Sequence, residues 1–150
     1  MPQLLGLFVS MLVLGAGVSF VIQQAVNANL QEHIHSSAWA GFVSYLGGTL
    51  CMLVFALAMR ETFPLTSAAL RSHWWAWTGG FFGAIYIAIS ILLVPRLGTA
   101  TFVALLVTGQ MLASLAFDHY GLFGVTEHPA NPARLLGAAL LIGGVLLIRR

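Results

Sequence analysis

Five long stretches without a charged residue run along the chain, and short polar segments separate them. About 20 consecutive apolar residues make a helix that can cross a hydrocarbon core of about 30 Å. In lipid, such a helix satisfies its own backbone hydrogen bonds. The pattern therefore predicts five transmembrane helices, at about residues 4–26, 37–59, 74–94, 97–117 and 133–149.

The segments between these stretches predict how the helices are connected. Polar residues at 32–35 indicate a short turn after the first helix, and residues 60–73 are polar enough to form a loop outside the bilayer. Pro95 and Arg96 separate the third stretch from the fourth, so we expect a tight antiparallel hairpin there.

The fifth stretch is the shortest of the five. Asn131 followed by Pro132 is typical of a helix start, with an N-cap side chain and proline at the first helical position. Only about 21 Å of helix, at 1.5 Å per residue, separates Arg134 from Arg149. We expect this helix to cross the membrane with its arginine side chains extended toward the surface.

Composition supports a chain that is almost wholly embedded in lipid. Hydrophobic residues make up 59% and charged residues 7% of the 150 residues, against about 25% charged in an average soluble domain. So few charged groups cannot cover a water-soluble surface. We therefore expect one domain, residues 1–150, with an all-α integral membrane fold and lipid around it.

The sequence lacks the marks of an enzyme or of a nucleic-acid-binding protein. It has no glycine-rich phosphate loop and no HExxH motif, and Cys51 is its one cysteine. Its basic residues do not form a cluster. The prediction is therefore no catalysis, no cofactor, no metal and no nucleic-acid partner.

The arginines do not favour either orientation in the membrane. With the N-terminus inside, Arg60, Arg71 and Arg134 face the cytoplasm, while Arg96, Arg149 and Arg150 face the other side. Positive residues normally set orientation by their excess on the cytoplasmic side. Either the count is uninformative because arginines are few, or the chain inserts both ways and works as an antiparallel pair. Such a pair would be an inverted repeat, which is common in secondary transporters.

Polar residues inside the predicted helices are the main candidates for a site. Gln23 and Asn27 share a helix face at a spacing of four, and so do Gln110, Ser114 and Asp118. Unpartnered amides are costly in lipid, so these faces either line a polar cavity or form hydrogen bonds between helices. With Tyr86 added from the third helix, the predicted substrate-binding residues are Gln23, Asn27, Tyr86, Gln110, Ser114 and Asp118.

Asp118 is the one acidic residue that could lie within the depth of the bilayer, because the residues after it are apolar again. Burial raises the pKa of a carboxyl group, so it could titrate in a proton-coupled cycle. It could equally pair with His119 or cap a helix at the water interface.

Small residues predict where helices approach closely. Gly79 and Gly83 form a GxxxG pair in the third helix, and Gly143 and Gly144 supply a small face in the fifth. Close backbone contact is a main source of helix association in lipid. These four glycines are therefore predicted to pack against other helices.

Four stretches resemble the YdcZ-type family of five-span bacterial inner-membrane proteins, in the drug/metabolite transporter superfamily. They are QQAVNANL (23–30), TGGFFGAIYIAISILLVPRLG (78–98), TGQMLASLAFDHYGLFG (108–124) and ARLLGAALLIGGVLLI (133–148). The most specific part is the third, with Gly109, Gln110, Ser114, Asp118, His119 and Gly121. With the matching order of spans, the resemblance covers nearly the whole chain.

The resemblance implies half of a ten-helix transporter fold, completed by an inverted copy or by a homologous five-span chain. It also implies a bacterial inner-membrane exporter of small molecules. We therefore expect a secondary transporter that works by alternating access as an antiparallel dimer. A non-transporting assembly or regulatory subunit is the alternative. The family does not assign a substrate to any residue, so the site prediction rests on spacing alone.

Overall fold

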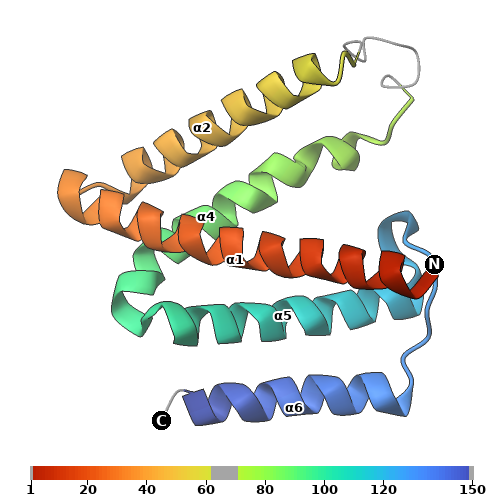
Figure 1. Ribbon diagram of the computed structural model, residues 1–150. Coiled ribbons are helices and arrows are strands. Elements are labelled where there is room, and N and C mark those ends of the chain that lie inside the picture. Colours follow the sequence, from red (N-terminus) through yellow and green to blue (C-terminus); the bar gives the residue numbers. More distant parts are fainter. Residues whose placement is uncertain (1, 62–70, 149–150) are drawn as a thin grey trace. The chain divides into compact units, whose positions relative to one another are not determined.

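The computed structural model describes residues 2–61 and 71–148. Within these ranges it contains helices and no strand (Figure 1). In chain order they are α1 (Pro2–Ile34), α2 (Ser37–Ala58), the 3₁₀ helix η1 (Trp74–Thr78), α4 (Gly79–Leu97), α5 (Thr99–Tyr120), the 3₁₀ helix η2 (Leu122–Gly124) and α6 (Pro132–Ile148). The predicted all-helical membrane fold is confirmed.

Four segments of the described residues are long and apolar enough to cross a membrane, namely Leu4–Ile34, Ser37–Ala58, Trp74–Leu97 and Thr99–Tyr120. α6 is shorter, at 17 residues, or about 26 Å at 1.5 Å per residue. That it crosses the membrane stays a prediction. The predicted loop at 60–73 and the last residue of the predicted fifth span, 149, fall partly or wholly outside the described residues.

Two helices extend beyond their predicted ends. α1 continues past residue 26 to Ile34, because the amides that follow Val26 are compatible with a helix and α1 meets its first charge only at Glu32. α4 continues through Pro95 to Leu97. Gly98 then takes a left-handed φ of 79° and is the single residue between α4 and α5.

The chain divides into two compact units, Met1–Pro95 and Arg96–Arg150. The boundary falls in the last turn of α4, at the proline. The first unit holds α1, α2 and most of α4, and the second holds α5, η2 and α6. That the two units form one five-span domain stays a prediction.

In the first unit, α1 and α2 form a hairpin and pack together (Figure 1). His35 ends α1 with a positive φ of 52°. The Ser36 side chain then caps α2 by accepting a hydrogen bond from the Trp39 N–H at 3.3 Å, as expected for an N-cap serine. A short turn joins the two helices as predicted, but it lies at residues 35–36, because residues 32–34 belong to α1.

α4 packs against this hairpin through a small apolar core. Ala40, Ile87 and Ile91 are buried, with Leu30 and Tyr45 packed against them. A Cβ built on Gly41 would lie in ordinary contact with the Ile87 side chain, at 3.5 Å. Small residues on α2 thus let the α4 side chains reach its backbone, which is how helices associate in lipid.

In the second unit, α5 and α6 lie side by side and run in opposite directions (Figure 1). α5 ends at Gly121, which has a left-handed φ of 60° and donates its N–H to the Phe117 carbonyl. α6 begins at Pro132, and the Asn131 side chain accepts the Arg134 N–H at 2.9 Å. The predicted start of the fifth helix is confirmed.

The first half of α1 exposes apolar side chains on different sides of the helix. Leu4, Leu7 and Val13 are 72%, 56% and 66% exposed, and they point in different directions around the helix. Such a helix is stable only in an apolar solvent or against another protein.

Candidate functional site

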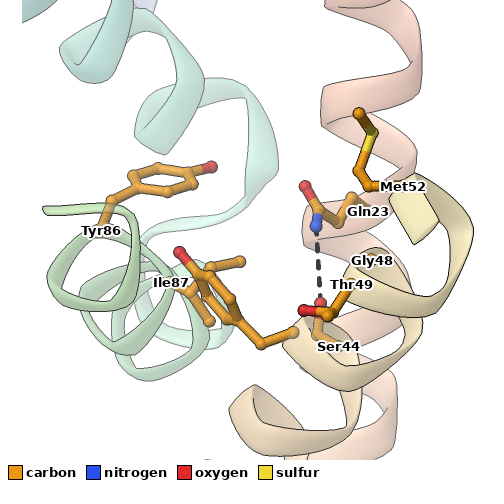
Figure 2. Close-up of a pocket in the computed structure, with 8 residues that line it drawn as sticks. Gln23, Ser44, Gly48, Thr49, Met52, Tyr86 and Ile87 are labelled. Atoms are coloured by element: carbon orange, nitrogen blue, oxygen red, sulfur yellow. Dashed lines mark hydrogen bonds between the residues drawn. The ribbon is translucent and has the colours of Figure 1, made fainter. Parts of the chain in front are cut away.

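An open cavity of about 500 Å³ lies in the first unit, among α1, α2 and α4 (Figure 2). We call it the large cavity. Its lining combines hydroxyl, amide and apolar groups and contains no charged side chain: Gln23, Ser44, Tyr45, Gly48, Thr49, Met52, Tyr86 and Ile87. Ligand sites are commonly of this kind, mainly apolar with a few polar groups.

One hydroxyl joins the polar stripe of α1 to α2. Ser44 Oγ accepts a hydrogen bond from the amide of Gln23 at 3.4 Å (Figure 2). It also accepts one from the amide of Asn27 at 3.1 Å. Asn27 is buried and does not line the large cavity, whereas Gln23 does. Asn27 therefore fixes the Ser44 side chain without itself lining the cavity, whereas the Gln23 side chain lines it.

Tyr86 completes the opposite wall from α4 (Figure 2). Its ring stacks on Phe20, with centroids 5.1 Å apart and an angle of 18° between planes. Its hydroxyl has no hydrogen-bond partner among the described residues. Ser90, one turn away, instead donates its proton to the Ile87 carbonyl at 2.9 Å. Because the Tyr86 hydroxyl is buried as well as unpaired, it is a costly group that a partner reaching it would stabilise.

The six predicted site residues divide between the two units. Gln23, Asn27 and Tyr86 come together around the large cavity. Gln110 and Ser114 lie exposed on α5, in the second unit. That they share a cavity with the first three stays a prediction.

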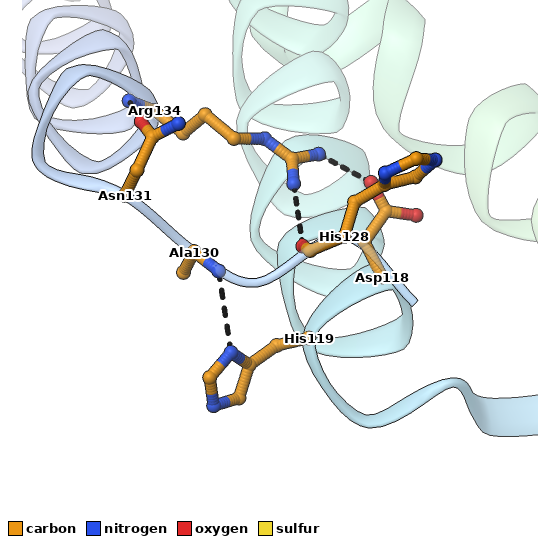
Figure 3. Close-up of polar contacts among 6 residues, drawn as sticks. All are labelled: Asp118, His119, His128, Ala130, Asn131 and Arg134. Atoms are coloured by element: carbon orange, nitrogen blue, oxygen red, sulfur yellow. Dashed lines mark hydrogen bonds and ion pairs between the residues drawn. The ribbon is translucent and has the colours of Figure 1, made fainter. Parts of the chain in front are cut away.

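Asp118 has a defined partner, and it is Arg134 rather than His119 (Figure 3). The guanidinium donates to the Asp118 carboxylate and, through its other terminal nitrogen, to the His128 carbonyl at 2.8 Å. The pair is partly buried, with side-chain exposures of 24% for Asp118 and 33% for Arg134. Asp118 therefore ties α5 to α6, and a role in substrate binding stays a prediction.

Helix dipoles explain why this pairing is stabilising. Asp118 lies near the negative C-terminal end of α5, and Arg134 lies in the first turn at the positive N-terminal end of α6. Each charge alone is placed unfavourably relative to its own helix. Bringing the two together offsets both penalties and closes the connection between the helices.

Backbone contacts hold the same connection. The His128 N–H donates to the Asp118 carbonyl at 2.7 Å, and the Ala130 N–H donates to His119 Nδ1 at 3.2 Å (Figure 3). A Cβ at Gly121 would lie 2.7 Å from Cγ of Glu127. Asp118, His119 and Gly121, three residues of the most specific resembling stretch, thus build this turn.

Removing either member of the ion pair is expected to lower thermal stability, and Arg134→Ala at least as much as Asp118→Ala, because Arg134 also donates to the His128 carbonyl. A hydrogen bond to a charged group contributes about 1.5–3 kcal/mol. Partial exposure reduces this, so we expect Asp118→Ala and Arg134→Ala each to cost about 1–2 kcal/mol, or a few degrees in Tm. Thermal unfolding of the purified protein in detergent micelles measures this.

The double variant should lose little more than either single variant, because the two residues act as one pair. Glu32→Ala, an exposed acid at the end of α1, is the control and should leave Tm unchanged. A different result would assign Asp118 to the substrate. In that case Asp118→Ala would abolish transport while Arg134→Ala kept both stability and transport.

The four predicted packing glycines have different surroundings. A Cβ on Gly83 would overlap the Tyr45 hydroxyl, so this glycine receives the Tyr45 side chain. A Cβ on Gly79, Gly143 or Gly144 would meet no atom of the described residues within 4 Å. Packing of these three against another helix stays a prediction.

The contribution of α2 was not predicted. Ser44, Tyr45 and Thr49 line the large cavity, whereas the predicted polar faces were on the first, third and fourth helices. A signal was present, since Gly41, Tyr45, Gly48 and Met52 recur at intervals of three and four. Gln24, whose buried amide has no partner among the described residues, was not predicted as a site residue either.

Among the described residues, no three His, Cys, Asp or Glu side chains gather closely enough to hold a metal ion. The large cavity is lined by hydrogen-bonding, aromatic and apolar groups.

These features define a multi-pass helical membrane protein whose first unit contains an open, mainly apolar cavity with a few polar groups. Comparison with known proteins gives the family. The model of the family described as "Putative inner membrane exporter, YdcZ" matches residues 8–147. The chain belongs to this family, so the resemblance inferred from its motifs is confirmed. The family description is that of a transporter rather than an enzyme, and it places the protein in the inner membrane.

A curated relative supports the assignment. The chain is 27% identical over 141 residues to "Inner membrane protein YdcZ" of Escherichia coli (strain K12), and the alignment covers 92% of each chain. No solved structure matches the chain.

Proposed function

We propose that the chain is one subunit of a secondary transporter that exports a small molecule by alternating access, as an antiparallel dimer with an identical or homologous chain. The family description supports the exporter function. The observation that carries the proposal is the large cavity, because it places unused polar groups inside a segment that is otherwise arranged for lipid.

The lining favours a substrate with an apolar body and one or two hydrogen-bonding groups. Gln23 and Thr49 contribute polar atoms on one side, and the ring of Tyr86, stacked on Phe20, lies on the other. A cation could also bind against the ring. An anion is disfavoured, because none of the eight lining residues is charged.

Transport by purified protein in liposomes tests the proposal. A panel of neutral amides, organic cations and organic anions is supplied outside, with and without a pH gradient, and accumulation is quantified by mass spectrometry. At least one neutral or cationic compound should accumulate, and Gln23→Ala should slow its uptake about fivefold. That is the factor expected for the loss of one hydrogen bond worth about 1 kcal/mol.

Ser10→Ala is the matched control, because this α1 side chain bonds to the Gly6 carbonyl at 2.9 Å, away from the large cavity. It should transport as the parent does. If no compound accumulates above empty liposomes under any gradient, the alternative function gains support. The chain would then be a non-transporting assembly or regulatory subunit.

A further inference from the structure

A second cavity, of about 300 Å³, lies between α2 and α4. We call it the small cavity. It is lined by Ser37, Ala38, Gly41, Phe42, Tyr45, Ala84, Ile87 and Ala88. Ser37 and Ala38 open α2 beside the α1–α2 turn, so this cavity lies toward that end of the first unit.

The two cavities share two lining residues, Tyr45 and Ile87. On α2 the large cavity is lined from Ser44 to Met52 and the small cavity from Ser37 to Tyr45, whereas on α4 both cavities are lined within residues 84–88. Tyr45 thus stands where the two hollows meet on α2. Along this helix each extends about 10–12 Å from it, at 1.5 Å per residue.

From this arrangement we infer that the Tyr45 side chain is the gate between two half-channels, with Ile87 as its fixed counterpart. The inference rests on the proposed function, since alternating access needs a barrier with an accessible space on each side. Ile87 is buried in the core, at 4% exposure, and is held there. Tyr45 is only half-buried, so it can change its rotamer.

The Tyr45 side chain lies against Gly83 of α4. A Cβ there would overlap the Tyr45 hydroxyl, whereas it would lie 3.4 Å from Cζ and 3.8 Å from Cε1. The hydroxyl alone therefore demands glycine, because the other two distances are ordinary contacts. This predicts a specific compensation: Gly83→Ala should displace the ring, and Tyr45→Phe should restore its position.

Thiol labelling in sealed vesicles tests the gate without a substrate. In a Cys51→Ser background, Thr49→Cys reports on the large cavity and Ala88→Cys on the small one. A membrane-impermeant maleimide is added outside the vesicles. For each cysteine, the fraction of protein labelled in sealed vesicles is divided by the fraction labelled after the vesicles are dissolved in detergent. With the gate shut, each cysteine is reached from one side only. The two fractions should then add up to about one, whatever mixture of orientations the membrane holds.

Tyr45→Ala should raise this sum toward two, because both cysteines become accessible from either side. Tyr45→Phe should leave it at one, since the ring forms the barrier. Phe42→Ala is the matched control. It removes an aromatic ring that lines only the small cavity, and it should leave the sum at one.

Gly83→Ala should raise the sum, and Gly83→Ala with Tyr45→Phe should bring it back to one. If Tyr45→Ala does not fold, the comparison of Gly83→Ala with the double variant tests the gate by itself. A sum that stays at one in Tyr45→Ala and Gly83→Ala, or that rises equally in Phe42→Ala, would overturn the gate. If the labelled fractions give the expected sums but no compound is transported in liposomes, the barrier at Tyr45 is supported and the proposed transport function is wrong.

Discussion

Reporter enzymes fused to the C-terminus are expected to be active on both sides of the membrane. An alkaline phosphatase fusion reports an outside terminus, and a fluorescent protein fusion reports an inside one. In the predicted five-span topology the six arginines divide three against three between the two sides, and the excess of positive residues is what normally sets orientation. Because opposed orientations in one membrane are what an antiparallel dimer requires, this result would support the proposed assembly.

Two pairs of added arginines should drive the chain in opposite directions. Glu61→Arg with Ser72→Arg raises the count on one side from three to five and should place the C-terminus outside. Glu32→Arg with His33→Arg adds two to the other side and should place it inside. Activity of the unmodified chain on one side only would rule out dual orientation. The dimer would then need a homologous partner with the opposite orientation.

Helix positions were the part of the fold that could be predicted from the sequence. Charge-free stretches are bounded by groups that cannot enter lipid, so the starts of α2 and α6 fall where the polar residues indicated. The far end of α1 was predicted too early. Amides such as Gln24 and Asn27 are compatible with a helix, and hydropathy alone does not mark where such a helix ends.

The partners of polar side chains could be predicted only in part. The spacing of Gln23 and Asn27 indicated one polar face, and their shared acceptor, Ser44, confirms that they act together. The pairing of Asp118 with Arg134 could not be read from spacing. It depends on the turn at 121–131, which brings the ends of α5 and α6 together.

The surroundings of glycines were the least predictable feature. Gly79 and Gly83 lie on one helix face, and periodicity treats them as equivalent. In the structure, only Gly83 meets a side chain of the same chain. The difference comes from the position of Tyr45 on α2, which a pattern along α4 does not contain.

Leucine at these two glycines is therefore expected to have very different effects. At Gly83 the first added carbon already overlaps the Tyr45 hydroxyl, and the further carbons of leucine would push α4 away from α2. Overpacking of a tight contact costs about 1–3 kcal/mol or more, and we expect Gly83→Leu to lose most of its folded protein. Size-exclusion chromatography of a fluorescent fusion in detergent measures the folded fraction.

Gly79→Leu is the matched change one turn away, and it should leave the folded chain intact because nothing within 4 Å opposes it. Its effect on the dimer is then informative. In lipid, a small face with no contact inside the chain either faces lipid tails or packs on a second copy. Loss of the dimer with a normal folded fraction, in Gly79→Leu or Gly143→Leu, would place that glycine at the interface between copies. If instead Gly79→Leu lost folded protein as completely as Gly83→Leu, the contact between Tyr45 and Gly83 would not account for the difference, and the packing assigned to α4 would be wrong.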